Sequence, residues 1–254
     1  MTAFTAFPHL PRQALHILLG EPWREELDLP LRRLGLVPVY IPENPEVEAR
    51  LRGHADLSVF PVGGARLILA RYLQGTEFVR ELLAMGCELS YTRRGQGSAY
   101  PEDVPLNVCR WQHRWIGRPD TAAPEIRAAF EESGDRDWIS VRQGYARCAC
   151  CLVSEQALIT ADEGIARALS GSGADVLRIS PGGVALPGFP YGFLGGCAFK
   201  IASGRLAFTG HLDEHPDRDA ILSFLERRQI EALFLTERPA FDIGGAIPLT
   251  ERED

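Results

Sequence analysis

The sequence is nearly devoid of lysine: of the 27 basic residues in a chain of 254, Lys200 is the one that is not arginine. Catalysis through a lysine Schiff base is therefore nearly excluded, although a GC-rich genome would produce the same bias. No stretch of about 18 apolar residues occurs, so no membrane-spanning helix is expected. Residues 1–10 lack the basic and apolar segments of a signal peptide. The formal net charge of −7 argues against a general nucleic-acid-binding protein.

The common cofactor and metal motifs are also missing. The chain has no GxGxxG or GxxxxGK[ST] segment, no CxxC pair and no zinc-finger spacing. We therefore expect no cofactor and no metal. Six cysteines are present without a secretion signal, which predicts reduced thiols in a cytoplasmic protein: they are Cys87, Cys109, Cys148, Cys150, Cys151 and Cys197.

One pattern repeats along the chain. A short apolar run precedes a helix-like segment five times, at 14–19, 65–70, 113–117, 157–160 and 205–209. The helix-like segments are 23–34, 76–85, 123–133, 163–169 and 216–227, and each is followed by a further strand. A turn then leads to one more apolar strand, at 56–62, 103–109, 148–153, 197–201 and 245–249. The unit is therefore strand–strand–helix–strand, present five times.

The two ends of the chain complete one unit between them. The run at 14–19 lacks the preceding strand that every other unit has, and the segment 245–249 supplies it. This predicts an α/β fold: a five-bladed pseudo-symmetric ββαβ propeller, formed by residues 1–254 as one domain and closed by pairing of the N- and C-terminal strands. Its blades start near residues 56, 103, 148, 197 and 245. A doubly wound Rossmann-like sheet is the alternative, but it would show about one strand per helix rather than three.

Short motifs at the blade starts carry a family resemblance. They are Gly53-His54-Ala55-Asp56 leading into 57–62, Pro101-Glu102-Asp103-Val104, and the stretch 205–217. Together with the five-unit ring they resemble the pentein fold of guanidino-group-modifying enzymes, a superfamily that also includes a non-enzymatic ribosome factor. The resemblance implies a small-molecule site in a central channel, where a cysteine attacks an amidine carbon, a histidine moves protons and acids hold the cation.

Two positions depart from that family. The resemblance implies a nucleophilic cysteine in the ring-closing strand, but residues 242–249 contain none. It implies a histidine at the start of the third channel strand, but residues 143–150 contain none. Either the catalytic set is built from other residues or catalysis has been lost.

Cys148 and His54 are the candidate catalytic residues. Cys148 lies at a predicted blade start, and on a strand Cys150 would share its face while Arg147 would point the other way. A buried cysteine that packs as a small hydrophobic residue is the alternative. His54 and Asp56 form an HxD pair that could share a ligand, or Asp56 could accept backbone N–H groups in a turn.

Matching the blades in order implies that Asp56 and Asp103 bind the cationic substrate. Four further residues are candidates for substrate binding: Arg147, Tyr191, His211 and Asp213. Tyr191 belongs to an aromatic loop at 180–194, which is either a lid or a packed Ω-loop. A zinc site of Cys148, Cys150 and His211 is a weaker alternative.

The sequence thus predicts a cytoplasmic hydrolase that acts on a guanidino, amidine or related cationic nitrogen compound. The second hypothesis is a non-catalytic binding or scaffold protein of the same fold. In either case we expect a small-molecule ligand, no nucleic acid and no membrane, and a homo-oligomer remains open.

Overall fold

The computed structural model describes residues 2–252, which form five three-stranded sheets and one two-stranded sheet. We number the three-stranded sheets as blades 1 to 5. In chain order they are β4 (Val59–Gly63), β5 (Arg66–Leu69) and β6 (Glu88–Tyr91); β7 (Cys109–Trp111), β8 (Arg114–Gly117) and β9 (Asp137–Ser140); β10 (Cys151–Leu152), β11 (Ala157–Thr160) and β12 (Asp175–Arg178); β13 (Ala198–Ala202), β14 (Arg205–Phe208) and β15 (Glu231–Phe234); and β16 (Ile247–Pro248), β2 (His16–Gly20) and β3 (Val37–Ile41). In every blade the first pair is antiparallel and the second is parallel.

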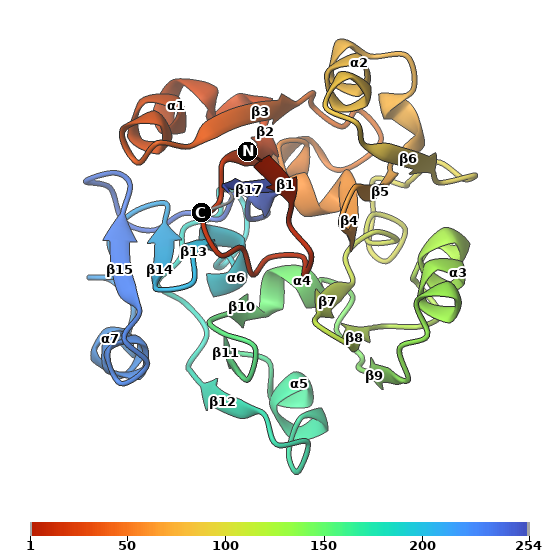
Figure 1. The fold of residues 1–254 in the computed structure, drawn as a ribbon. Coiled ribbons are helices and arrows are strands. Elements are labelled where there is room, and N and C mark those ends of the chain that lie inside the picture. The colour runs from red at the N-terminus through yellow and green to blue at the C-terminus, as the bar shows by residue number, and fades with distance from the viewer. Residues whose placement is uncertain (1, 253–254) are drawn as a thin grey trace.

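A helix joins the second and third strands of each blade and lies on the outside of the ring (Figure 1). These helices are α1 (Arg24–Arg33), α2 (Glu77–Ala84), α3 (Pro124–Ser133), α5 (Glu163–Ala168) and α7 (Arg218–Glu226). The short helices are η1 (Glu21–Trp23), η2 (Ala49–Leu51), η3 (Ala55–Leu57), η4 (Arg71–Leu73), α4 (Ala146–Ala149) and α6 (Leu194–Cys197). Side-chain oxygens cap two of the blade helices: Thr76 accepts from the N–H of Val79, and Asp162 from that of Ile165. None of the helices in the described range could cross a membrane.

Blade 5 is assembled from both ends of the chain. β16, near the C-terminus, pairs antiparallel with β2, and β2 pairs parallel with β3. A separate pair, β1 (Thr2–Phe4) with β17 (Thr250–Arg252), lies across the middle of the ring (Figure 1). The predicted closure of a five-bladed propeller by its terminal strands is therefore confirmed.

The hydrophobic core is divided into clusters between neighbouring blades. In β2, Ile17 and Leu19 pack toward blade 4, while Leu18 packs toward blade 1. In β8, Trp115 packs toward blade 1 and Ile116 toward blade 3. Because both faces of these strands are buried, they appear in the sequence as continuous apolar runs rather than as an alternation. Each blade thus depends on the two that flank it.

The first strand of every blade begins later than the sequence predicted: β7 begins at 109 rather than near 103, and β16 at 247 rather than near 245. In the other three blades a helical turn comes first. The segments expected to start strands at residues 56, 148 and 197 form the short helical turns η3, α4 and α6, and the strands follow at 59, 151 and 198. The expectation that Cys148 and Cys150 share one face of a strand was therefore wrong. Cys148 lies on α4, whereas Cys150 ends that turn and packs in the core between blades 2 and 3.

Replacing Gly20 tests the contact between blades 5 and 1. A Cβ atom on Gly20, at the end of β2, would lie 1.9 Å from the carbonyl oxygen of Gly53. We expect Gly20→Ala to destabilise the fold by about 1–3 kcal/mol, because a well-packed backbone must move apart. That corresponds to a melting temperature lowered by at least about 2 °C. Gly204→Ala is the matched control, since its Cβ would make only an ordinary contact at 3.6 Å. Equal melting temperatures for the two variants would contradict the prediction.

Candidate active site

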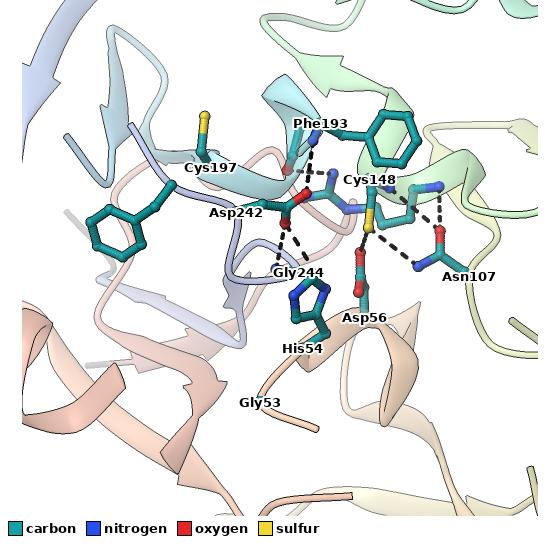
Figure 2. Close-up of polar contacts among 12 residues, drawn as sticks. Gly53, His54, Asp56, Asn107, Cys148, Phe193, Cys197, Asp242 and Gly244 are labelled. Atoms are coloured by element: carbon teal, nitrogen blue, oxygen red, sulfur yellow. Dashed lines mark hydrogen bonds and ion pairs between the residues drawn. The ribbon is translucent and has the colours of Figure 1, made fainter. Parts of the chain in front are cut away.

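The HxD pair lies at the entrance to blade 1. His54 precedes the helical turn η3, and Asp56 lies within it. The backbone N–H of Asp56 donates to the carbonyl of Gly244 at 3.3 Å, which ties this turn to the lead-in of blade 5. The carbonyl of Gly53 accepts from the indole N–H of Trp23 at 3.2 Å. These contacts direct both side chains of the pair toward the centre of the ring (Figure 2).

Cys148 is positioned by an asparagine from blade 2. The side-chain oxygen of Asn107 accepts from the N–H of Arg147 at 2.8 Å and from that of Cys148 at 3.4 Å. Its amide nitrogen lies 3.5 Å from the sulfur of Cys148. One buried side chain therefore holds the first turn of α4 and contacts the thiol.

Asp242 enters the site from the lead-in to blade 5. Its Oδ2 accepts from the N–H of Phe193 at 2.8 Å, and its Oδ1 accepts from that of Gly244 at 2.9 Å. Oδ1 also lies 3.9 Å from Nδ1 of His54. Two glycines make this approach possible. A Cβ on Gly196 would lie 1.9 Å from Asp242 Oδ1, and a Cβ on Gly244, at φ +69°, would lie 2.5 Å from the Cβ of His54.

The side chains of His54, Asp56, Cys148 and Asp242 meet at the centre of the ring (Figure 2). The thiol of Cys148 donates to Oδ2 of Asp56 across 2.6 Å. One ligand atom each from His54, Asp56 and Cys148 lies within 4.8 Å of the other two. All four side chains are only 1–3% exposed. Within residues 2–252, Nε2 of His54 and Oδ1 of Asp56 have no hydrogen-bond partner, so both retain capacity for a ligand.

Burial dominates the electrostatics of this cluster. It raises the pKa of Asp56 to about 6, against a lesser opposing effect of His54. It also raises the pKa of the Cys148 thiol well above its ordinary value, and the carboxylates of Asp56 and Asp242 raise it further. The thiol of Cys148 is therefore protonated at neutral pH. A cation placed between the two carboxylates would favour both the ionised acids and the thiolate.

Arg147 supplies a fixed positive charge next to the cluster. It is buried, and its Nη1 donates to the carbonyls of Cys150 at 3.1 Å and Gly195 at 3.4 Å. Its charge lowers the pKa of Asp56. Its guanidinium is thus engaged by the backbone, which corrects the expectation that its side chain points away from the channel on a strand.

Asp103 lies next to the cluster rather than in it. It accepts a hydrogen bond from the hydroxyl of Tyr145, and its Oδ1 is buried without a partner among the described residues. Burial raises the pKa of Asp103. The ring of Tyr145 stacks on Tyr100 at 5.8 Å and packs against Phe193 at 6.2 Å. Asp103 therefore adjoins an aromatic row that leads to Asp242 through Phe193.

Two predicted substrate-binding residues, His211 and Asp213, lie apart from this cluster. His211 pairs with Glu237 at 3.4 Å, and Asp213 is exposed and pairs with Arg218 at 3.0 Å. Both follow β14, which is a middle strand, so their loop is one strand removed from the channel. The ion pairs of His211 and Asp213 correct their expected position at the channel. Tyr191 is 42% exposed. It lies beside Gly192, whose Cβ would be 2.5 Å from that of Asp242, so its substrate-binding role stays a prediction.

The predicted zinc set is not brought together either. Cys150 lies in the core and His211 pairs with Glu237, so neither faces Cys148. A different group has a spacing that would suit a metal ion. It consists of the thiolate of Cys148, the imidazole of His54 and the carboxylate of Asp56.

Asp242 and Asn107 are site residues that the sequence analysis missed. The signal for Asp242 is its place before a glycine pair at the start of the ring-closing strand, where the family resemblance implies a cysteine. Asn107 carries no comparable local signal, because its role depends on contact with α4.

Solved structures of similar fold cover nearly the whole chain. An inosamine-phosphate amidinotransferase from Streptomyces griseus aligns with a TM-score of 0.63 and 11% identity, over 99% of this chain and 98% of that one. Agmatine deiminase from C. jejuni aligns with a TM-score of 0.54 and 10% identity, over 99% and 97%. DDAH from Pseudomonas aeruginosa, complexed with citrulline, aligns with a TM-score of 0.50 and 10% identity, over 89% and 94%.

These likenesses, with the five closed blades, define a pentein fold. No curated protein sequence matches the chain. The chain belongs to a family of unknown function, DUF6873, whose sequence profile matches residues 20–247.

Substituting Asp56 tests the electrostatic cost of the site. The pKa of Asp56 is about 6 in the folded chain and about 3.8 in the unfolded chain. Ionisation of this carboxyl therefore lowers the free energy of unfolding as the pH rises above about 4. The full reduction is reached above about pH 6. The difference corresponds to about 3 kcal/mol. We therefore expect Asp56→Asn to raise the free energy of unfolding by up to about that amount at pH 8. The gain should vanish below about pH 4.

Urea denaturation at both pH values measures this effect. Asp219→Asn, at an exposed ion pair on α7, is the control and should change stability by less than about 1 kcal/mol. A variant at Asp56 that is less stable than the native chain at pH 8 would contradict the assignment.

Proposed function

We propose that this chain hydrolyses a C–N bond of a small guanidino or amidine compound, with Cys148 as nucleophile and His54 as the acid–base group. The observation that carries the proposal is the 2.6 Å contact of the Cys148 thiol with Asp56, with His54 beside both. A thiol, an imidazole and carboxylates at one point provide the nucleophile, the proton carrier and the cation anchors that such chemistry needs. The amidinotransferase, deiminase and DDAH structures of similar fold support the same substrate class.

The departures from the family pattern have a common explanation under this proposal. The resemblance places the histidine in blade 3 and the cysteine in blade 5, whereas here His54 belongs to blade 1 and Cys148 to blade 3. Both are displaced by two blades in the same direction. Because all five blade starts face one channel in a pseudo-symmetric ring, a displaced set can still converge at its centre.

The substrate cation is bound between Asp56 and Asp242 in this mechanism. Its two or three N–H donors would pair with the carboxylate oxygens, including the unpartnered Oδ1 of Asp56. The ion pair would offset the burial that raises the pKa of Asp56. The same positive charge would counter the effect of the two acids on the thiol. The substrate thus helps to ionise its own nucleophile.

The steps then follow with protons accounted for. The proton of Cys148 passes to His54, and the thiolate forms a bond to the amidine carbon. His54 gives that proton to the departing nitrogen as the C–N bond breaks, which leaves the amidino group on sulfur. Water attacks the same carbon and gives a proton to His54. The C–S bond breaks, and Cys148 recovers its proton.

Substrate entry requires movement of the segment 180–193, because the four central side chains are almost fully buried. This segment is fastened at two points. Arg50 donates to the carbonyl of Gly188 at 3.0 Å and lies over the ring of Phe189 at 4.8 Å. The N–H of Phe193 binds Asp242. We propose that the segment is a lid whose closure contacts a substrate-binding acid directly.

The nucleophile is tested by Cys148→Ser, assayed for ammonia or amine release from a panel of guanidino and amidine compounds. We expect turnover to fall at least about 1,000-fold, since an activated nucleophile is lost. Cys87→Ser is the matched control, because Cys87 is a buried free thiol at the outer side of blade 1 and should leave turnover unchanged. Retained turnover in Cys148→Ser would refute the role. Binding of such compounds without turnover in the native chain would favour the non-catalytic hypothesis.

The paired acids are tested by alkylation of the thiol. We expect chloroacetamidine, which is cationic, to modify Cys148 at least about tenfold faster than neutral chloroacetamide, because the carboxylates attract an amidinium. Asp242→Asn should reduce that preference. Peptide mass spectrometry separates Cys148 from the other five cysteines. Equal rates for the two reagents would show that the acids do not direct a cation to the thiol.

A further inference from the structure

A second pocket, of about 380 Å³, lies at the opposite end of the channel. The proposed active site is built where the channel strands begin, as at Cys148 before β10. The second pocket is lined by Ser154 and Ser203, which follow β10 and β13. It therefore opens where the same strands end.

The N-terminal segment 5–12 crosses the ring and forms one side of this pocket. Thr5 donates to the carbonyl of Leu249 at 3.0 Å and accepts from the N–H of Gly64 at 3.0 Å. The N–H of Ser203 donates to the carbonyl of Arg12 at 3.0 Å. The segment is thus attached to blades 1, 4 and 5, and the pocket has fixed walls.

Lys200, the single lysine of the chain, lines this pocket from β13. It is 3% exposed, and its ammonium donates to the carbonyl of Ser203 at 2.5 Å. An ammonium carries three donors, yet among residues 2–252 no carboxylate lies within 4.0 Å of it. Burial lowers the pKa of Lys200 to about 8. A buried cation without a counter-ion is costly, and an anionic ligand would remove that cost.

The geometry points to a binding site for a small monocarboxylate with a short apolar chain, held by an ion pair between its carboxylate and Lys200. Phe7, Leu10 and Pro11 line the pocket and suit the apolar chain. Arg12, Glu155 and Glu251 also line it. The lining therefore carries two positive and two negative side chains, and this balance disfavours a dianion such as phosphate more than a monoanion. This site is independent of the chemistry proposed for Cys148.

Because the chain holds one lysine, lysine labelled with ¹³C at Cε gives one side-chain signal, which reports Lys200 alone. We expect butyrate to shift this signal saturably, and its neutral analogue butyramide to leave it unmoved. A signal that butyrate does not move, or that butyramide moves equally, would overturn the proposal. A stronger response to inorganic phosphate than to butyrate would overturn the choice of a monocarboxylate.

Variants then connect binding to the ammonium group. Butyrate should raise the melting temperature of the native chain, since a ligand that binds only the folded state stabilises it. In Lys200→Met this increase should disappear, with a Kd at least about tenfold weaker by calorimetry. Arg205→Met, at an exposed ion pair on β14, should respond as the native chain does. Undiminished butyrate binding by Lys200→Met would refute the site. The labelling experiment uses the native chain, so it decides the question even if that variant fails to fold.

Discussion

Pairing of the two chain ends is the constraint on which the rest of this structure depends. β16 and β2 are separated by almost the whole sequence, yet together they make blade 5. Every core cluster between blades needs a blade on each side, so an open ring would expose apolar faces of blades 1 and 4. The channel exists only in the closed ring. Closure is also what brings Asp242 within 3.9 Å of His54, 188 positions earlier in the sequence.

Burying charged side chains at the centre of the channel opposes folding, and hydrogen bonds to those side chains reduce this penalty. Backbone N–H groups of Phe193 and Gly244 satisfy Asp242, and Asn107 holds the turn that carries Cys148. Asp56 is compensated less fully, because its Oδ1 has no partner among the described residues, and its burial raises its pKa to about 6. The site contains two carboxylates, and the guanidinium of Arg147, which is bonded to backbone carbonyls, is a positive charge that acts on Asp56. One further positive charge would balance the second carboxylate, and the amidinium of the proposed substrate would supply it. Stability given up at such a position is typical of a functional site.

The fold was predictable from sequence because strands buried on both faces leave continuous apolar runs, and because the missing strand before residue 14 reappears at 245–249. The starts of the blades were not predictable in detail. Apart from Arg147, the segments Ala146–Ala149 and Leu194–Cys197 consist of small or apolar residues, like the strands they precede. Their helical turns are fixed by distant partners, such as the side chain of Asn107 at the start of α4. Local sequence contains no record of such a partner.

The same distinction separates the predicted from the missed site residues. His54, Asp56 and Cys148 were found because blade starts converge on the channel, a property of the fold. His211 and Asp213 were misplaced because a polar loop after a middle strand resembles, in sequence, a loop at the channel. Asp242 was overlooked because the family pattern directs attention to a cysteine there. Its role becomes evident only from the backbone donors that surround it.

Within the described part of the chain, Lys200 is a buried positive charge without a counter-ion, whereas the channel centre contains buried negative charges. If its position served packing alone, a methionine would fill it without the cost of burying an ammonium. If it needed only a positive charge, arginine, which supplies the other 26 basic residues, would be the expected choice. An arginine would have to fit a broad planar group where the side chain is 3% exposed. The ammonium of lysine supplies the positive charge and is compact enough for this buried position. An anion bound in the pocket would provide its counter-ion. Because every other basic residue is arginine, the lysine at position 200 indicates that this position needs a compact ammonium group.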